Sequence, residues 1–149
     1  MTSPNALART AAVFYLLVFA TGIFALAGDK LVVPGNAAAT AANIVAHETA
    51  FRLAWLANLL ASACYVVVTA LFYRLFKPVS ATVSLTAAFF SLAGCAVSAA
   101  SLVFYAAPLT ILRMNAFPSA EAQALSLLCL RLSAQTNNTA LVFFGVSAC

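Results

Sequence analysis

The densest group of ionisable side chains in this sequence is His47, Glu48 and Arg52. Glu48 and Arg52 are four residues apart, a spacing that places an acid and a base on one helical face in the favourable order. Such a pair is either an ion pair at the start of a membrane helix or a ligand or proton site at the membrane edge. His47 is the only histidine, which excludes a bis-histidine haem site, a two-histidine zinc site and an HExxH metalloprotease within one chain.

Two further polar side chains, Asn58 and Arg131, fall inside apolar stretches. An amide in hydrocarbon needs a hydrogen-bond partner, so we expect Asn58 to join two helices, with substrate binding as the alternative. An arginine within a membrane segment indicates a functional site, unless it pairs with an acid such as Glu48 or Glu121. The sequence therefore predicts one candidate polar site, composed of His47, Glu48, Arg52, Asn58 and Arg131.

Known catalytic motifs are missing from the sequence. It contains no GxSxG nucleophile context, no glycine-rich phosphate loop and no dinucleotide fingerprint, and its three acidic residues leave little for acid–base chemistry. The four cysteines are scattered without CxxC or Cys/His spacing, which is typical of small buried side chains rather than of a zinc site. We therefore expect a protein that is not an enzyme, with no cofactor and no metal.

The composition places these residues in a membrane. The chain of 149 residues is 65% apolar and 7% charged, whereas a soluble domain has about 45–50% apolar and about 25% charged residues. The net charge of +4 comes from basic residues that stand singly near the ends of apolar runs, where such residues anchor membrane helices. The lipid bilayer is the expected partner, a partner helix or a homo-oligomer is an additional candidate, and nucleic acid is not expected.

The apolar runs predict a single membrane domain of four helices. Three full spans are expected at about 7–27, 51–76 and 79–107, and a fourth at 120–149. The first run also fits a secretory signal, because Arg9 precedes it and Ala25, Leu26 and Ala27 form a cleavage-like triplet. The weakly apolar stretch 37–46, which follows the helix-capping Asn36, predicts a short helix at the interface or packed on the bundle.

The fourth span is the least regular. A loop is expected at 108–118, and the final apolar run, 140–149, has only ten residues. The fourth helix therefore either includes 120–132, with Arg131 inside the bundle, or is cut off by the chain end as in a truncated protein.

Stripes of small residues predict how the helices pack. One stripe lies in the second span and one in the third, and small residues let two helices approach closely. We therefore expect these two faces to meet. The stripes are Ala54, Ala57, Ala61, Cys64 and Ala87, Ser91, Cys95, Ala99.

The string LVVPGNAAATAANI at 31–44, followed by Glu48 and by Phe51, Arg52 and Leu53, resembles the first extramembrane segment of the bacterial membrane family named domain of unknown function 4386. The segment VFFG at 142–145 is similar to that family's fourth spanning helix. The resemblance implies a bundle of about six helices, of which this chain supplies the first two thirds, and it removes the signal-peptide interpretation. The family has no assigned activity to carry over.

The sequence thus predicts an all-α, multi-pass transmembrane bundle of unknown biochemical role in a bacterial plasma membrane. A small-molecule or ion transporter, or a transporter subunit, is the alternative, although no internal repeat supports it. Basic residues number three at the N-terminal end of the bundle and four at the other, so the count does not fix the orientation. The short, acid-free turn that holds Arg74 and Lys77 favours a cytoplasmic N-terminus.

Overall fold

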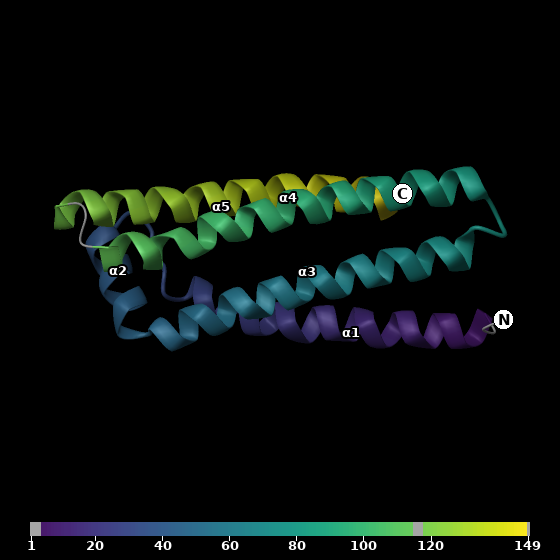
Figure 1. Cartoon of the computed structure of the whole chain (residues 1–149), viewed down its shortest axis with the longest axis horizontal. Helices are drawn as coiled ribbons and strands as arrows, with labels where there is room; N and C mark the ends of the chain where they lie inside the picture. The colour runs from purple at the N-terminus through teal and green to yellow at the C-terminus, as the bar shows by residue number, and fades with distance from the viewer. Residues whose placement is uncertain (1–3, 115–117, 149) are drawn as a thin grey trace.

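The computed structural model describes residues 4–114 and 118–148, which form five helices and no strands (Figure 1). Backbone N–H and C=O groups in a bilayer must bond within their own segment, and the apolar runs meet this need by forming helices. In chain order the helices are α1 (Pro4–Asp29), α2 (Ala37–Ala46), α3 (Glu48–Phe76), α4 (Ala81–Met114) and α5 (Ser119–Ala148).

The predicted all-α membrane bundle is confirmed. Three helical segments of the described chain are long and apolar enough to cross a membrane: Asn5–Leu26, Glu48–Phe76 and Ala81–Met114. The predicted short helix follows the first of them as α2. The fourth helix, α5, runs without interruption for 30 residues, or about 45 Å, and so includes the stretch 120–132 and Arg131. Residue 149 of the predicted span lies outside the described residues.

The predicted loop at 108–118 is wrong in its first part. Helix α4 continues through Pro108 to Met114, and the loop residues 115–117 lie outside the described chain. A proline removes one backbone hydrogen bond, but membrane helices tolerate this when neighbouring helices pack around the proline. Pro108 is fully buried, which is consistent with such packing.

Helix α2 closes one end of the bundle. Its first turn is capped by Asn36, whose side-chain oxygen accepts a hydrogen bond from the backbone N–H of Ala39 (2.9 Å). Thr40, Ala41 and Ile44 are buried, and α2 contacts α3, α4 and α5. Of the two expectations for this helix, packing on the bundle is therefore correct.

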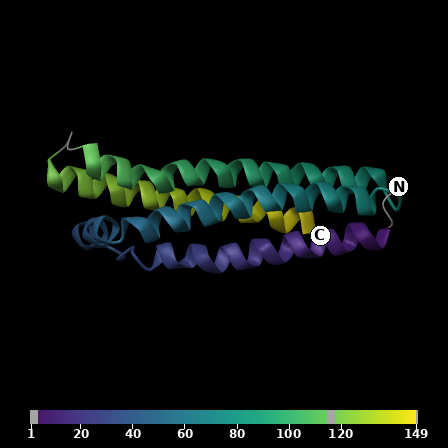
Figure 2. The same cartoon turned by 60° about the horizontal axis from the view of Figure 1, so that its bottom comes forward.

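The long helices associate as two tight pairs, α1 with α3 and α4 with α5 (Figures 1 and 2). In the second pair, small residues that are seven positions apart share one face of each helix. Ser133 of α5 donates a hydrogen bond to the carbonyl of Ser101 in α4 (2.9 Å). Gly94 of α4 lies against the ring of Phe144 in α5. The buried positions are Gly94, Ser101 and Pro108 on α4 and Ser126, Ser133 and Ala140 on α5.

The predicted meeting of the two small-residue stripes is wrong in detail. Ala54 packs against Gly28 of α1, and Ala99 is exposed. Helices α3 and α4 do touch, but of the two stripes only Ser91 takes part in the three polar and aromatic contacts between them. They are the Thr69–Ser91 hydroxyl pair (2.7 Å), the Trp55 Nε1 bond to the Leu102 carbonyl (3.1 Å) and the stacked rings of Phe51 and Tyr105. Near α2, the rings of Phe51 and Tyr105 belong to a buried cluster that also contains Ile44 and Leu130.

Candidate functional site: a polar cleft between the helix pairs

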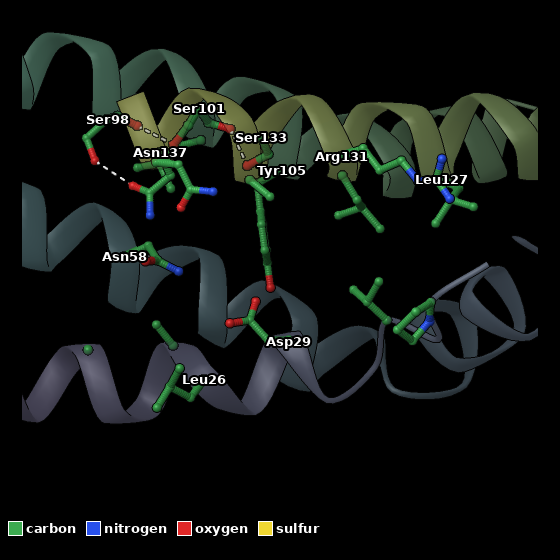
Figure 3. Close-up of a pocket in the computed structure, with 18 of the residues that line it drawn as sticks. Leu26, Asp29, Asn58, Ser98, Ser101, Tyr105, Leu127, Arg131, Ser133 and Asn137 are labelled. Carbon is green, nitrogen blue, oxygen red and sulfur yellow. Dashed lines mark hydrogen bonds between the residues drawn. The ribbon is translucent and has the colours of Figure 1, made fainter. Parts of the chain in front are cut away.

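A cleft of about 640 Å³ lies between the two helix pairs (Figure 3). Helices α1 and α5 form its two edges, and in the described chain none of their Cα atoms approach within 8 Å of each other. Residues of α3 and α4 also line it, and Pro34 and Gly35 of the α1–α2 connection lie at one end. The arrangement is a lateral opening between two long helices.

Polar side chains from four helices line this cleft, which is unusual for a bundle so rich in apolar residues. A second cleft of about 710 Å³ lies between α3 and α4 at the opposite end, but its lining residues carry no charge. Of these two clefts, the first therefore holds the charged side chains, Asp29 and Arg131. Its polar lining comprises Asp29, Asn58, Ser62, Ser98, Ser101, Tyr105, Arg131, Ser133, Asn137 and Asn138.

Tyr105 is the most unusual of these residues. Its side chain is buried to 8% exposure, and its ring stacks on Phe51 with centroids 4.8 Å apart. Its hydroxyl is the one buried side-chain oxygen or nitrogen of the described residues that has no hydrogen-bond partner. An unpaired buried polar group costs about 1–3 kcal/mol, so an acceptor that enters the cleft would recover this energy.

Gly28 makes room for that hydroxyl. A methyl group on Gly28 would collide with the Tyr105 oxygen and with Cβ of Ala54. The glycine is thus required by close approach of three helices rather than by a turn. It lets α1 pack closely on α3 and leaves space for the Tyr105 side chain of α4 at the inner wall of the cleft.

Asp29, the last residue of α1, places the only carboxyl group of the cleft lining beside Tyr105 (Figure 3). The residue stays accessible from the cleft, but the surrounding atoms withdraw its carboxyl from bulk water. This partial burial raises the pKa of Asp29 above its usual value of 3.8. A carboxyl group with a raised pKa is more often neutral, and it can then donate as well as accept a hydrogen bond.

The structure brings Asn58 and Arg131, two of the predicted site residues, into the cleft. The amide nitrogen of Asn58 donates to the carbonyl of Ala54 in its own helix (3.1 Å). The predicted interhelical link through Asn58 is therefore wrong, and contact with a ligand stays a prediction.

Arg131 makes no ion pair with any residue that the structure describes, so the predicted pairing with Glu48 or Glu121 is wrong as well. The position along α5 explains this result. Arg131 lies twelve residues beyond the start of the helix, about 18 Å along its axis. Its helical phase turns it toward the cleft.

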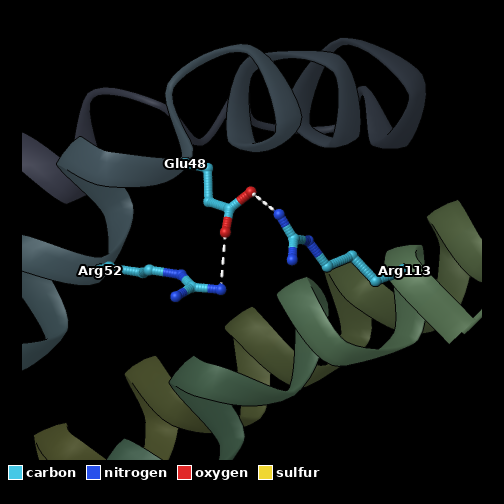
Figure 4. A network of polar contacts seen from close by, with 3 residues as sticks. All are labelled: Glu48, Arg52 and Arg113. Atoms are coloured by element: carbon cyan, nitrogen blue, oxygen red, sulfur yellow. Dashed lines mark hydrogen bonds and ion pairs between the residues drawn. The ribbon is translucent and has the colours of Figure 1, made fainter.

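The other three predicted residues form a separate polar cluster at the α2 end (Figure 4). Glu48 bonds to Arg52 (2.7 Å) and, through its second oxygen, to Arg113. His47 joins α2 to α3 and is exposed. None of these residues lines the cleft, so the candidate site predicted from sequence divides into two places.

Arg113 was not predicted as a partner, because a helix break was expected at Pro108. The continued helix brings its guanidinium to Glu48, and the resulting network joins α3 to α4. Both arginines are more than half exposed, so the network is best described as a partly solvated staple. Within the described residues, no group of three or more His, Cys, Asp or Glu side chains could hold a metal ion.

Several cleft residues were missed by reasoning from sequence, notably Asp29, Tyr105, Ser98, Asn137 and Asn138. Asn138 had a usable signal, because it shares a helical face with Arg131 at a spacing of seven. Asp29 resembles an ordinary helix end in the sequence, and Tyr105 lies in an apolar run. Ser98 donates a hydrogen bond to Asn137 (3.1 Å), a contact that only the packing of α4 on α5 produces.

Comparison with curated proteins and with solved structures finds no match to this chain. The family model described as "Domain of unknown function (DUF4386)" matches residues 10–149. That match covers nearly the whole chain, including all the residues that line the cleft. The predicted resemblance is therefore confirmed, and this membrane protein belongs to the DUF4386 family.

Proposed function

We propose that this protein is a non-enzymatic membrane protein that binds a small molecule in the cleft between its helix pairs. The observation that carries the proposal is the unpartnered, buried hydroxyl of Tyr105 on the wall of a polar cleft. Membrane bundles bind ligands between facing helices through a few inward polar groups, and polar groups at membrane depth mark functional sites.

The hydrogen bonds of the cleft support binding rather than catalysis. A nucleophilic serine needs a neighbouring base that takes its proton. Here the cleft serines donate to carbonyl oxygens instead: Ser98 to Asn137 (3.1 Å), Ser101 to the Ser98 backbone (2.7 Å) and Ser133 to the Ser101 backbone (2.9 Å). The only histidine of the chain, His47, lies outside the cleft.

A transporter, or a subunit of one, is the second candidate, and the depth of the amides favours it. Asn58 lies ten residues into α3, about 15 Å along the helix, which is about half of the 30 Å thickness of a bilayer core. Asn137 lies on the opposite wall (Figure 3). Transporters bind their substrates near the midplane between facing helices, so these amides would suit a polar substrate.

We further propose that the protein resides in the plasma membrane with its N-terminus inside. The turn between α3 and α4 carries Arg74 and Lys77 without an acid, and basic residues in short loops favour the cytoplasmic side. The α1–α2 connection, which contains Asn36, and the α3–α4 connection, which contains Ser80, lie at opposite ends of the bundle (Figure 1). An impermeant thiol reagent should label a cysteine introduced at Asn36; labelling only of one at Ser80 would reverse the assignment.

The binding proposal is tested by filling the cleft. Gly22 lines it and has no atom within 4 Å of an added Cβ, and the same open space surrounds Gly145, which does not line it. We expect Gly22→Phe to reduce the amount of a small molecule or lipid that copurifies with the wild-type protein, measured by mass spectrometry. Gly145→Phe should leave that amount unchanged. Identical copurifying molecules in equal amounts from both variants would contradict the proposal.

A further inference from the structure

We propose that the ligand of the cleft is an amphiphile whose head group carries an anionic oxygen group, a phosphate or a carboxylate, and whose hydrocarbon tail leaves between α1 and α5. This inference rests on the proposed binding function and names the class of ligand. It follows from three observations: an unpaired hydroxyl, an unpaired cation and a lateral opening.

The unpaired hydroxyl of Tyr105 requires an acceptor. Its ring is fixed by stacking on Phe51, and Gly28 closes the space beside the oxygen, so the hydroxyl cannot turn toward another part of the bundle without disturbing both contacts. A phosphate or carboxylate oxygen accepts a hydrogen bond from a phenol more strongly than a neutral group does. The donor is therefore already in place before a ligand enters.

Arg131 supplies the charge. It is the only cation among the residues that line the cleft, and it has no ion pair in the described part of the chain. The other arginines of this end, Arg52 and Arg113, share Glu48 outside the cleft. The one carboxyl of the lining, Asp29, lies beside Tyr105 and not beside Arg131 (Figure 3). Arg131 thus favours an anionic oxygen group at its part of the cleft.

The opening of the cleft indicates where the rest of the ligand lies. The backbones of α1 and α5 are not closely packed in the described chain, and Leu26 and Leu127 stand on the two sides of the cleft (Figure 3). Leu26 is well exposed, as expected of a side chain that faces lipid. A soluble anion would gain nothing from this opening, whereas a hydrocarbon tail would remain in the bilayer while the head group reaches Tyr105.

The test uses the purified full chain in a neutral detergent, dodecyl maltoside, and three probes. Dodecyl phosphate has the head and the tail, inorganic phosphate has the head alone, and dodecanol has the tail alone. We expect dodecyl phosphate to raise the melting temperature in a saturable way, and the other two to leave it unchanged at the same concentrations.

Two variants locate the site. Arg131→Gln should weaken binding of dodecyl phosphate about ten- to hundredfold, and Tyr105→Phe about two- to tenfold. Arg74→Gln at the other end of the bundle and Tyr15→Phe in the uncharged cleft are the matched controls and should bind as the wild type does. Without a probe, Tyr105→Phe should melt no lower than the wild type, because it removes an unpaired oxygen; this separates binding from folding.

The outcomes distinguish this inference from the function on which it rests. An equal stabilisation by inorganic phosphate would overturn the amphiphile and assign a soluble anion. Equal binding by Tyr105→Phe, Arg131→Gln and the wild type would overturn the site. If no probe raises the melting temperature but Gly22→Phe still loses a copurifying molecule, the proposed function stands and the ligand class is wrong. Retention of all copurifying molecules by Gly22→Phe would overturn both.

Discussion

Replacement of Gly28 by alanine is expected to destabilise the bundle, although alanine favours a helix. An alanine in place of a glycine inside a helix usually stabilises it by about 0.5–1 kcal/mol. At Gly28 the new methyl group would collide with the Tyr105 oxygen and with Cβ of Ala54, whereas at Gly22, in the same helix, it would meet nothing within 4 Å. Both substitutions gain the same helix propensity, but only Gly28→Ala introduces the collision.

The difference between these two variants therefore measures the collision. Inserting a methyl group into a well-packed interior costs about 1–3 kcal/mol, so the free energy of unfolding of Gly28→Ala should lie below that of Gly22→Ala by about that amount. Gly22→Ala itself should be slightly more stable than the wild type. Unfolding in dodecyl maltoside with added dodecyl sulfate, followed by circular dichroism, provides both values.

A double-mutant cycle checks the cause. Tyr105→Phe removes the colliding oxygen and should restore part of the stability that Gly28→Ala loses, with the remainder due to Ala54. Equal stability of the two alanine variants, or no rescue by Tyr105→Phe, would refute the proposed close approach of α1, α3 and α4.

Three other substitutions test separate features of the structure. Gly94→Ala would place a methyl group 2.6 Å from the ring of Phe144 and should lower the free energy of unfolding by about 1–3 kcal/mol, whereas Gly145→Ala should not lower it. The folded state favours the neutral form of Asp29, so stability should fall as the pH rises above 3.8; Asp29→Asn should flatten that slope in a pH series, and an unchanged slope would exclude this carboxyl. Glu48→Gln breaks two partly exposed ion pairs and should cost about 0.5–2 kcal/mol without changing ligand binding, whereas a loss of binding would connect the staple to the cleft.

The helices could be predicted from sequence because their signals are local. Apolar runs predicted three of the long helices, and Asn36 marked the start of α2, where its side chain caps the helix as expected. Pro108 was misinterpreted because proline breaks helices in water, where an unbonded carbonyl and an exposed turn are both easily solvated. Inside a membrane bundle, a break in the helix would leave more backbone groups without hydrogen-bond partners than the proline does. Helix α4 therefore continues past Pro108.

The pairing of the helices could not be predicted because small residues occur on several faces of each helix. Ala54 belongs to the predicted stripe of α3, yet it meets Gly28 of α1. The seam between α3 and α4 is set instead by large groups, including the stacked rings of Phe51 and Tyr105. Spacing in sequence reveals which residues share a face, but only the competition among all faces decides which neighbour that face meets.

The candidate site could be predicted only in part, for a related reason. Asn58 and Arg131 are conspicuous because they are polar inside apolar runs, and both line the cleft. Tyr105 has no such signal, since the role that we propose for it depends on a missing hydrogen bond, and a missing partner is a property of the packed structure. The ion pair of Glu48 and Arg52 was predicted correctly, because the i,i+4 spacing is a local signal. That spacing does not indicate whether the pair lines a cavity.

The low apolarity of α5 is best explained by the cleft. One face of this helix presents small residues to α4, as at Ser133, and a second face turns Arg131 and Asn138 to the cleft. Only the remaining face, with exposed residues such as Leu128 and Leu132, can face lipid. A helix that exposes only one of its three faces to lipid needs fewer apolar residues, and so has a lower mean hydropathy, than a helix surrounded by lipid. The fourth helix therefore looks irregular in sequence because it lines the cleft, and its polar residues are where a comparison with other members of the family should begin.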